Sequence, residues 1–136
     1  MMIPAGRSEL KKAFHQHTSV AENGASPSHN LLTFYAVECG IKSVYLKRNS
    51  LNTTKDIRDE RLNKSHDLSL WVKILRLPAT ITGTNTVFYL RRDQQSAWSV
   101  ARAHEAWRYG IAIRPDDEKR LVGWLVSIQQ WVKERL

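Results

Sequence analysis

The chain has 136 residues, of which 42% are hydrophobic and 25% are charged, and its formal net charge at pH 7 is +8. This length and composition predict a single domain over residues 1–136 that buries its own core without disulfides or a bound metal. The excess of Lys and Arg favours an anionic partner such as RNA or a nucleotide, although it also suits solubility or docking to an acidic protein.

Two helices are predicted at the start of the chain. Ser8–Ala21 has apolar residues at helical spacing, with Ser8 available as the N-cap. A break follows, and it ends at Ser26 and Pro27, which suit the cap and the first position of a second helix. Because the linker is short, we expect the two helices to form an antiparallel hairpin.

The second helix, Leu31–Arg48, is expected to be the central one. Its broad apolar stripe is interrupted by Glu38 and Lys42, which are neighbours on a helix because they are four residues apart. A second face carries only small residues that let another helix approach closely: Ala36, Gly40 and Ser43. Glu38 and Lys42 form either a structural ion pair or part of a site completed by an Arg or a His from elsewhere in the chain.

The middle of the chain is less regular. Residues 49–65 are polar and rich in Lys and Arg, which predicts a loop suited to phosphate contact or a short helix over Asp56–Leu62. A third helix is predicted over Leu68–Leu75, capped by Ser65 or Asp67 and ended by Pro78. Between Pro78 and Asp93, β-branched and aromatic residues predict an extended loop or a short hairpin.

Two more helices are predicted in the last third. Asp93 is positioned to cap a fourth helix that reaches Trp107 and stops at Gly110, and Pro115 begins a fifth with the strongest amphipathic pattern in the chain. The expected architecture is therefore all-α, a bundle of about five helices with an irregular or extended loop before the fourth.

Several classes of protein are poorly supported by the sequence. It has no glycine-rich phosphate loop, no Cys/His metal cluster and no nucleophile elbow, so we expect no metal or cofactor. No apolar run is long enough to span a membrane, no signal-peptide core is present, and Cys39 is the only cysteine, so we expect a cytoplasmic protein without membrane association.

His104, with Arg108 four residues later on the fourth helix, is a weaker alternative site, and the preferred interpretation is a surface histidine beside an arginine. Four tryptophans lie at helical spacing and are expected mainly in the core, with at most one or two exposed for base stacking or a dimer interface: Trp98, Trp107, Trp124 and Trp131.

Three motifs in order resemble the HEPN domain family. They are the central Ala36–Ser43 segment with its Glu38/Lys42 pair, the His66-Asp67-Leu68 step before the third helix, and Arg108-Tyr109 before the last turn. The resemblance implies a small helical bundle, commonly a homodimer. It also implies a role in prokaryotic toxin–antitoxin or antiviral defence systems, beside a nucleotidyltransferase or another defence-system subunit.

The resemblance leaves two functions open. Active members of the family are metal-independent ribonucleases with an Arg followed, after a short gap, by a His, and Arg61 with His66 matches that pattern. In such a site His66 would act as acid or base, Arg61 or Arg108 would stabilise the phosphorane, and Glu38 would orient His66 or Arg108.

The match differs from the family's pattern, because it precedes the third helix and Leu62 follows the Arg. This difference favours the other function, a non-catalytic RNA- or nucleotide-binding subunit in which Arg108 satisfies Glu38. The basic residues expected to contact nucleic acid are Lys42, Lys47, Arg48, Arg58 and Lys64.

Overall fold

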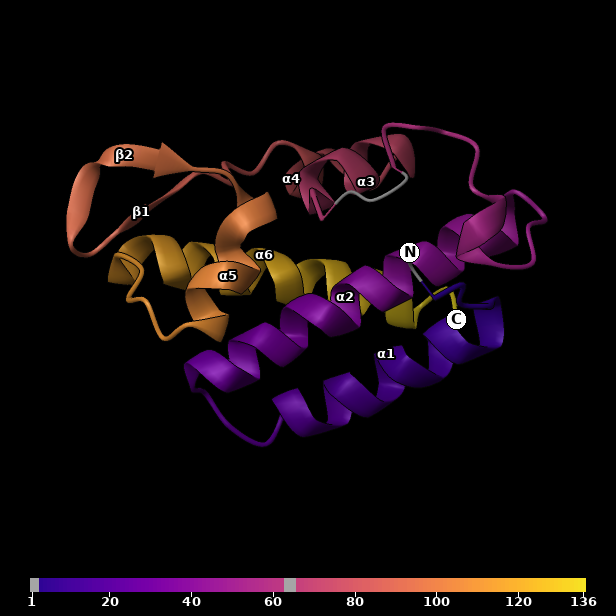
Figure 1. Ribbon diagram of the computed structural model, residues 1–136, viewed down its shortest axis with the longest axis horizontal. Helices are drawn as coiled ribbons and strands as arrows, with labels where there is room; N and C mark the ends of the chain where they lie inside the picture. The colour runs from indigo at the N-terminus through magenta and orange to yellow at the C-terminus, as the bar shows by residue number, and fades with distance from the viewer. Residues whose placement is uncertain (1–2, 63–65) are drawn as a thin grey trace.

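The first two helices form an antiparallel pair along one side of the protein in a computed structural model, which describes residues 3–62 and 66–136 (Figure 1). They are α1 (Arg7–Ala21) and α2 (Pro27–Arg48). The Ser26 hydroxyl accepts a hydrogen bond from the His29 backbone N–H and Pro27 is the first helical residue, as predicted. Ser8 is not the cap of α1, because the helix begins one residue earlier and Glu9 closes its first turn onto the Gly6 N–H.

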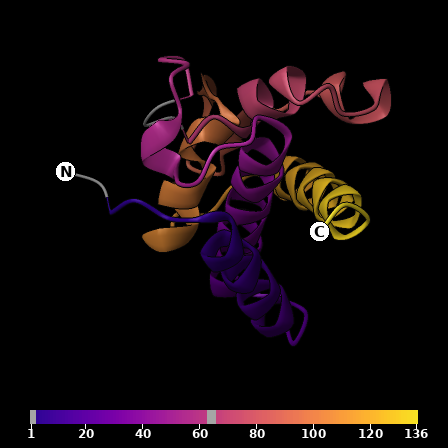
Figure 2. The ribbon, with the colours of Figure 1, turned by 90° about the vertical axis from the view of Figure 1, so that its right-hand side faces the viewer.

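The small face of α2 is where three helices meet. Ala36, Gly40 and Ser43 are all buried, and a methyl group placed on Gly40 would lie 2.7 Å from Phe14 of α1 and 2.7 Å from Val132 of α6 (Pro115–Lys133). Two helices therefore approach α2 closely at this point. The prediction that α2 packs on two sides is confirmed, and Figure 2 shows α6 beside the α1–α2 pair.

After α2 the chain continues through a polar loop and two short helices. The polar stretch contains a short 3-10 turn, η1 (Thr54–Asp56), and is otherwise a loop up to Leu62, so of the two alternatives the loop forms and the short helix over Asp56–Leu62 does not. The main chain at Thr53 and Thr54 pairs with Gly6 and Ala5. Helix α3 (Leu68–Ile74) begins at its Asp67 cap, and one helical turn, α4 (Ala79–Thr82), follows Pro78.

The predicted fourth helix is wrong in its first half. Asp93–Trp98 is the strand β2, which pairs antiparallel with β1 (Phe88–Leu90). The side chains of β2 are all exposed, so no buried helical face holds the segment, and main-chain pairing with β1 decides its structure. After the 3-10 turn η2 (Val100–Arg102), helix α5 covers only Ala103–Arg108.

The fold is thus mostly helical with a small two-stranded sheet, not strictly all-α. Helix α6 anchors the sheet, because the Asp117 carboxylate accepts a hydrogen bond from the Tyr89 N–H and Arg120 donates to the carbonyls of Asn85 and Val87. The hairpin consequently projects from one end of the helical layers (Figure 1).

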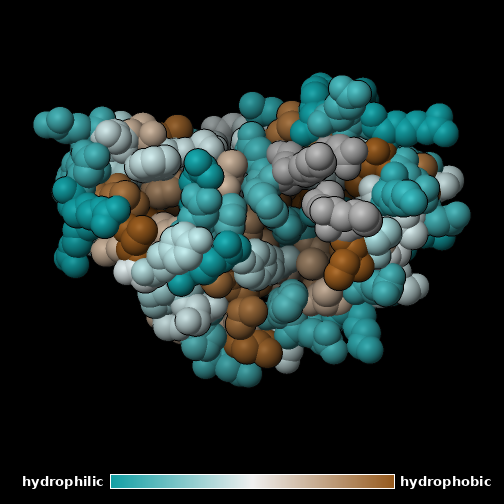
Figure 3. Space-filling view, in the orientation of Figure 1, coloured by the Kyte–Doolittle hydropathy of each residue, from teal (hydrophilic) through white to brown (hydrophobic). Residues whose placement is uncertain are grey.

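The surface in the view of Figure 3 is mostly hydrophilic, with apolar residues in small separate patches. Three of the four spaced tryptophans are buried, Trp107, Trp124 and Trp131, whereas Trp98 is 40% exposed, so the expectation of one or two exposed is confirmed. No helix in residues 3–62 or 66–136 is both long and apolar enough to cross a membrane.

Candidate functional site: a histidine cluster between α2 and α5

Glu38 of α2 receives its partner from the segment that leads into α3. Its carboxylate accepts a hydrogen bond from His66 Nδ1 at 3.0 Å and contacts Lys42 Nζ at 3.5 Å, while its side chain is only 13% exposed. Burial alone would raise the pKa of Glu38, but the His66 hydrogen bond and the Lys42 charge outweigh it and the net pKa lies below its ordinary value. Glu38 is therefore an ionised, well-partnered carboxylate that fixes the orientation of His66.

His66 is the accessible member of this pair. The hydrogen bond to Glu38 raises its pKa, more than burial and the nearby charges of Lys42 and Arg108 lower it. Its side chain is 53% exposed, and Nδ1 is the nitrogen that Glu38 engages. The hydrogen bond to Glu38 therefore orients the His66 ring and favours its protonated form, whose other nitrogen can donate to a ligand.

His104 lies against His66 and is buried, so its interpretation as a surface residue is wrong. The centroids of the two rings are 4.9 Å apart and their planes are inclined by 43°. The ring of Phe34, on α2, has its centroid 5.2 Å from that of His104. His104 is 6% exposed, and its Nδ1 has no hydrogen-bond partner among the described residues. Burial lowers its pKa, as do the charges of His66 and Arg108.

The sequence placed His104 in a helix correctly but assigned it to the exposed face. On α5 it lies on the buried side with Ala103 and Trp107. That side is covered because Phe34 of α2 and His66 pack against His104, and both are distant from it in the sequence.

Arg108 joins this group but does not satisfy Glu38 as the non-catalytic hypothesis expected. It stands at the exposed end of α5, and its guanidinium donates a hydrogen bond to the Tyr35 hydroxyl of α2. The charge of Arg108 lowers the pKa of both His66 and His104, so it lies within electrostatic range of both rings. We call Glu38, Lys42, His66, His104 and Arg108 the histidine cluster.

Arg61 is not part of the histidine cluster. It lies on an exposed turn, where its guanidinium makes two hydrogen bonds with Asp59, at 3.1 Å and 2.7 Å. The structure describes no contact between Arg61 and His66, although the two match the family's spacing in sequence. The Arg61 guanidinium, which the sequence predicted would stabilise the phosphorane, is thus paired with Asp59.

The remaining predicted nucleic-acid contacts are spread over the molecule. Lys47 donates to the carbonyl of Arg135, and Arg48 donates to the carbonyl of Leu75 at 2.6 Å and lies 5.2 Å over the Trp131 ring, so both tie helix ends together. Arg58 is exposed on the loop after η1, and Lys64 lies outside the described residues. Lys42 is the one member of that set that the structure brings to the histidine cluster.

The arrangement suits two kinds of chemistry with a phosphate. Lys42 and His66 contact the buried Glu38 carboxylate and Arg108 lies within electrostatic range of His66, so the three form a cationic surface for an anion when His66 is protonated. Two adjacent imidazoles, one favouring its charged form and one its neutral form, also constitute an acid and a base. No group of three or more metal-ligating side chains occurs in the described part of the chain.

The motifs that resemble HEPN domains meet in this cluster, since it contains Glu38, Lys42, His66 and Arg108. Membership of that family nevertheless stays a prediction. Comparisons of the chain with protein-family models, curated proteins and solved structures found no match.

Proposed function

We propose that the protein is a HEPN-like RNA- or nucleotide-binding domain that holds a phosphate at the histidine cluster and acts as a non-catalytic subunit. The observation that carries the proposal is the Glu38–His66 hydrogen bond of 3.0 Å, which holds an exposed imidazole within electrostatic range of Lys42 and Arg108. The formal net charge of +8 supports an anionic polymer as the partner.

The cellular setting follows from the family resemblance alone. It favours a homodimer in a prokaryotic defence or toxin–antitoxin system, working with a nucleotidyltransferase or another subunit of that system. Light scattering of the purified protein tests the dimer, and co-purification with a protein encoded beside it tests the subunit role.

Binding is tested with a fluorescein-labelled single-stranded RNA followed by anisotropy at about 50 mM and about 200 mM salt. His66→Gln and Arg108→Gln should weaken binding and lower the slope of log K against log salt by about 0.7 for each lost phosphate contact. The matched control is His15→Gln/His17→Gln, which removes two histidines from α1 at a distance from the cluster. Equal affinities for the cluster variants and the control would refute the assignment of the site.

A second function, metal-independent RNA cleavage, is favoured by the adjacent rings of His66 and His104, whose centroids are 4.9 Å apart. Neutral His104 would accept the proton of the ribose 2′-hydroxyl as its oxygen attacks the phosphorus. Protonated His66 would donate a proton to the departing 5′-oxygen, leaving a 2′,3′-cyclic phosphate and a 5′-hydroxyl, while Arg108 stabilises the phosphorane charge.

Cleavage of the labelled RNA with EDTA present separates the two functions and the two candidate site pairs. Loss of cleavage in His66→Gln and His104→Gln, with Arg61→Ala still active, would assign the histidine pair. Loss in Arg61→Ala would restore the Arg61/His66 pairing, and an uncut RNA that still binds would leave the non-catalytic function.

A further inference from the structure

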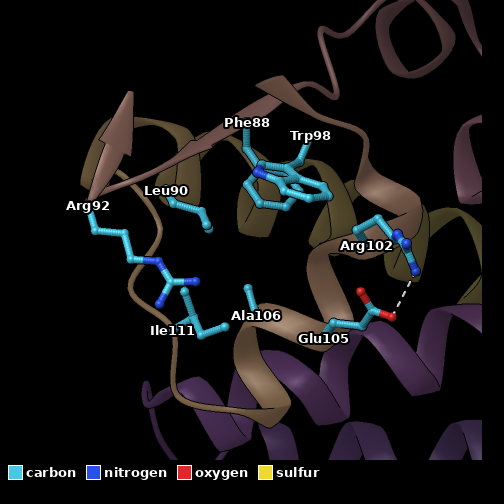
Figure 4. Close-up of a pocket in the computed structure, with 8 residues that line it drawn as sticks. All are labelled: Phe88, Leu90, Arg92, Trp98, Arg102, Glu105, Ala106 and Ile111. Carbon is cyan, nitrogen blue, oxygen red and sulfur yellow. Dashed lines mark hydrogen bonds and ion pairs between the residues drawn. The ribbon is translucent and has the colours of Figure 1, made fainter. Parts of the chain in front are cut away.

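A pocket of about 150 Å³ lies between the hairpin and α5 and is lined by residues outside the histidine cluster (Figure 4). Its apolar lining includes Phe88 and Trp98 from the paired strands, Leu90 from β1 and Ile111 from the turn after α5. Phe88 and Trp98 are register partners in an antiparallel pair, so their side chains project from the same face of the hairpin. The hairpin thus builds the pocket from two aromatic rings.

The two aromatic residues differ in accessibility. Phe88 is 1% exposed and belongs to the core, whereas Trp98 is 40% exposed. An indole left open to solvent at the wall of a pocket offers a stacking surface for a flat ring.

The volume limits what can enter. A cavity of this size accommodates a ring such as benzene, and it falls below the ~300 Å³ at which pockets for whole drug-sized ligands begin. The occupant is therefore a single six-membered aromatic ring that carries the rest of its molecule outside.

The charges beside the pocket indicate what that ring is attached to. Arg92 lies at one side and Arg102 at the other, the latter paired with Glu105 at 2.9 Å (Figure 4). The Arg92 guanidinium beside an aromatic wall complements a ring with an attached anion, and Glu105, which Arg102 holds in place, offers an acceptor for a ring N–H. A nucleobase with its phosphate has both features.

Helix α5 connects this pocket to the histidine cluster. Arg102, Glu105 and Ala106 fall on one side of the helical turn and His104 and Arg108 on another. A strand of RNA that follows the surface of α5 therefore meets both places.

We propose that the pocket is a nucleobase subsite in which one pyrimidine of a bound RNA stacks on Trp98 while Arg92 contacts its phosphate. The inference rests on the proposed RNA-binding function and adds the base preference to it. A purine is disfavoured, because its second ring exceeds the space that holds one six-membered ring.

Trp98 itself supplies the assay, because the tryptophans at positions 71, 107, 124 and 131 are buried and only Trp98 is open to a quencher. Intrinsic fluorescence is titrated with UMP, uridine and AMP. We expect saturable quenching by UMP, with about tenfold weaker binding of AMP, and weaker binding of uridine because it lacks the phosphate.

The variants are Trp98→Leu and Arg92→Gln, with Val126→Ala on α6 as an exposed apolar control. UMP binding, followed by calorimetry for the Trp98 variant, should weaken about tenfold in both test variants and stay unchanged in the control. Circular dichroism verifies that each variant is folded.

Parallel titrations with RNA distinguish failure of the nucleobase subsite from failure of the proposed phosphate site. If His66→Gln weakens RNA binding while UMP neither quenches Trp98 nor binds by calorimetry, the subsite is wrong and the proposed function stands. If UMP binds at Trp98 while His66→Gln leaves RNA binding unchanged, the subsite stands and the phosphate site is wrong. Preferential binding of an aromatic amino-acid amide over UMP would overturn the subsite in favour of a peptide.

Discussion

Gly40 is the residue at which the packing of α2 is most sensitive to a single atom. The added methyl of Gly40→Ala would lie 2.7 Å from Cδ1 of Phe14 and 2.7 Å from Cγ1 of Val132, and both side chains are 0% exposed. Because these neighbours belong to α1 and α6, a shift of α2 that relieves one contact does not by itself relieve the other. Overpacking of this kind costs roughly 1–3 kcal/mol, against a helix-propensity gain of about 1 kcal/mol for replacing Gly with Ala.

Gly123 of α6 provides the matched control, because it is exposed and an added methyl meets nothing within 4 Å. Gly123→Ala should stabilise the protein by about 1 kcal/mol, so the difference between the two variants isolates the steric cost. The expected gap of about 2 kcal/mol corresponds to a Tm difference of roughly 4–8 °C, measured by calorimetry and by urea unfolding. Equal stabilisation by both substitutions would refute the three-helix contact at Gly40.

Three further predictions concern other parts of the molecule. Burial and the neighbouring Glu38 carboxylate raise the pKa of the Cys39 thiol from 9.0 to about 11, so its modification by a thiol reagent at neutral pH should be about a hundredfold slower in the folded protein than in urea. NMR titration of the ring protons should give a pKa above 6.5 for His66 and one below 6.5 for His104, and the reverse order would contradict the cluster geometry. Arg120→Met removes the donors that hold the chain before β1, so amide exchange in β1 should accelerate while that of α2 stays unchanged.

The sequence was informative wherever one local signal decided the structure. The Ser26-Pro27 start of α2, the Asp67 cap of α3 and the end of α2 at Arg48 follow from capping and helix-breaking chemistry that acts within a few residues. The need of Glu38 for a partner also followed from its position in an apolar stripe, and His66 fills it.

The sequence failed where tertiary pairing overrode local preference. Asp93 resembles an N-cap, yet its carboxylate accepts from the Gln95 N–H inside a strand that exists because β1 and α6 hold the hairpin. That error moved the predicted start of the helix. The burial of His104 was missed for another reason, because it depends on Phe34 and His66, which are distant from it in the sequence. The pairing of Arg61 with His66 was predicted from their spacing alone. That spacing gives no information about Asp59, which is two residues from Arg61 and forms hydrogen bonds with its guanidinium.

The opposite pKa directions of the two histidines set the order in which their rings lose their protons. The raised pKa of His66 means that its contribution to stability is complete below 6.5 and is lost as the pH rises through its folded value. The lowered pKa of His104 means that the unfolded chain gains a proton first as the pH falls below 6.5, so acid destabilises the fold through His104. Between these two folded values His66 is protonated and His104 is neutral. In the proposed RNA-binding function this state presents a cationic His66 to a phosphate, and in the alternative cleavage function it provides one acid and one base. Both functions need His66 protonated, so a pH profile alone does not separate them. Analysis of the RNA after binding, for a 2′,3′-cyclic phosphate end, is the measurement that does.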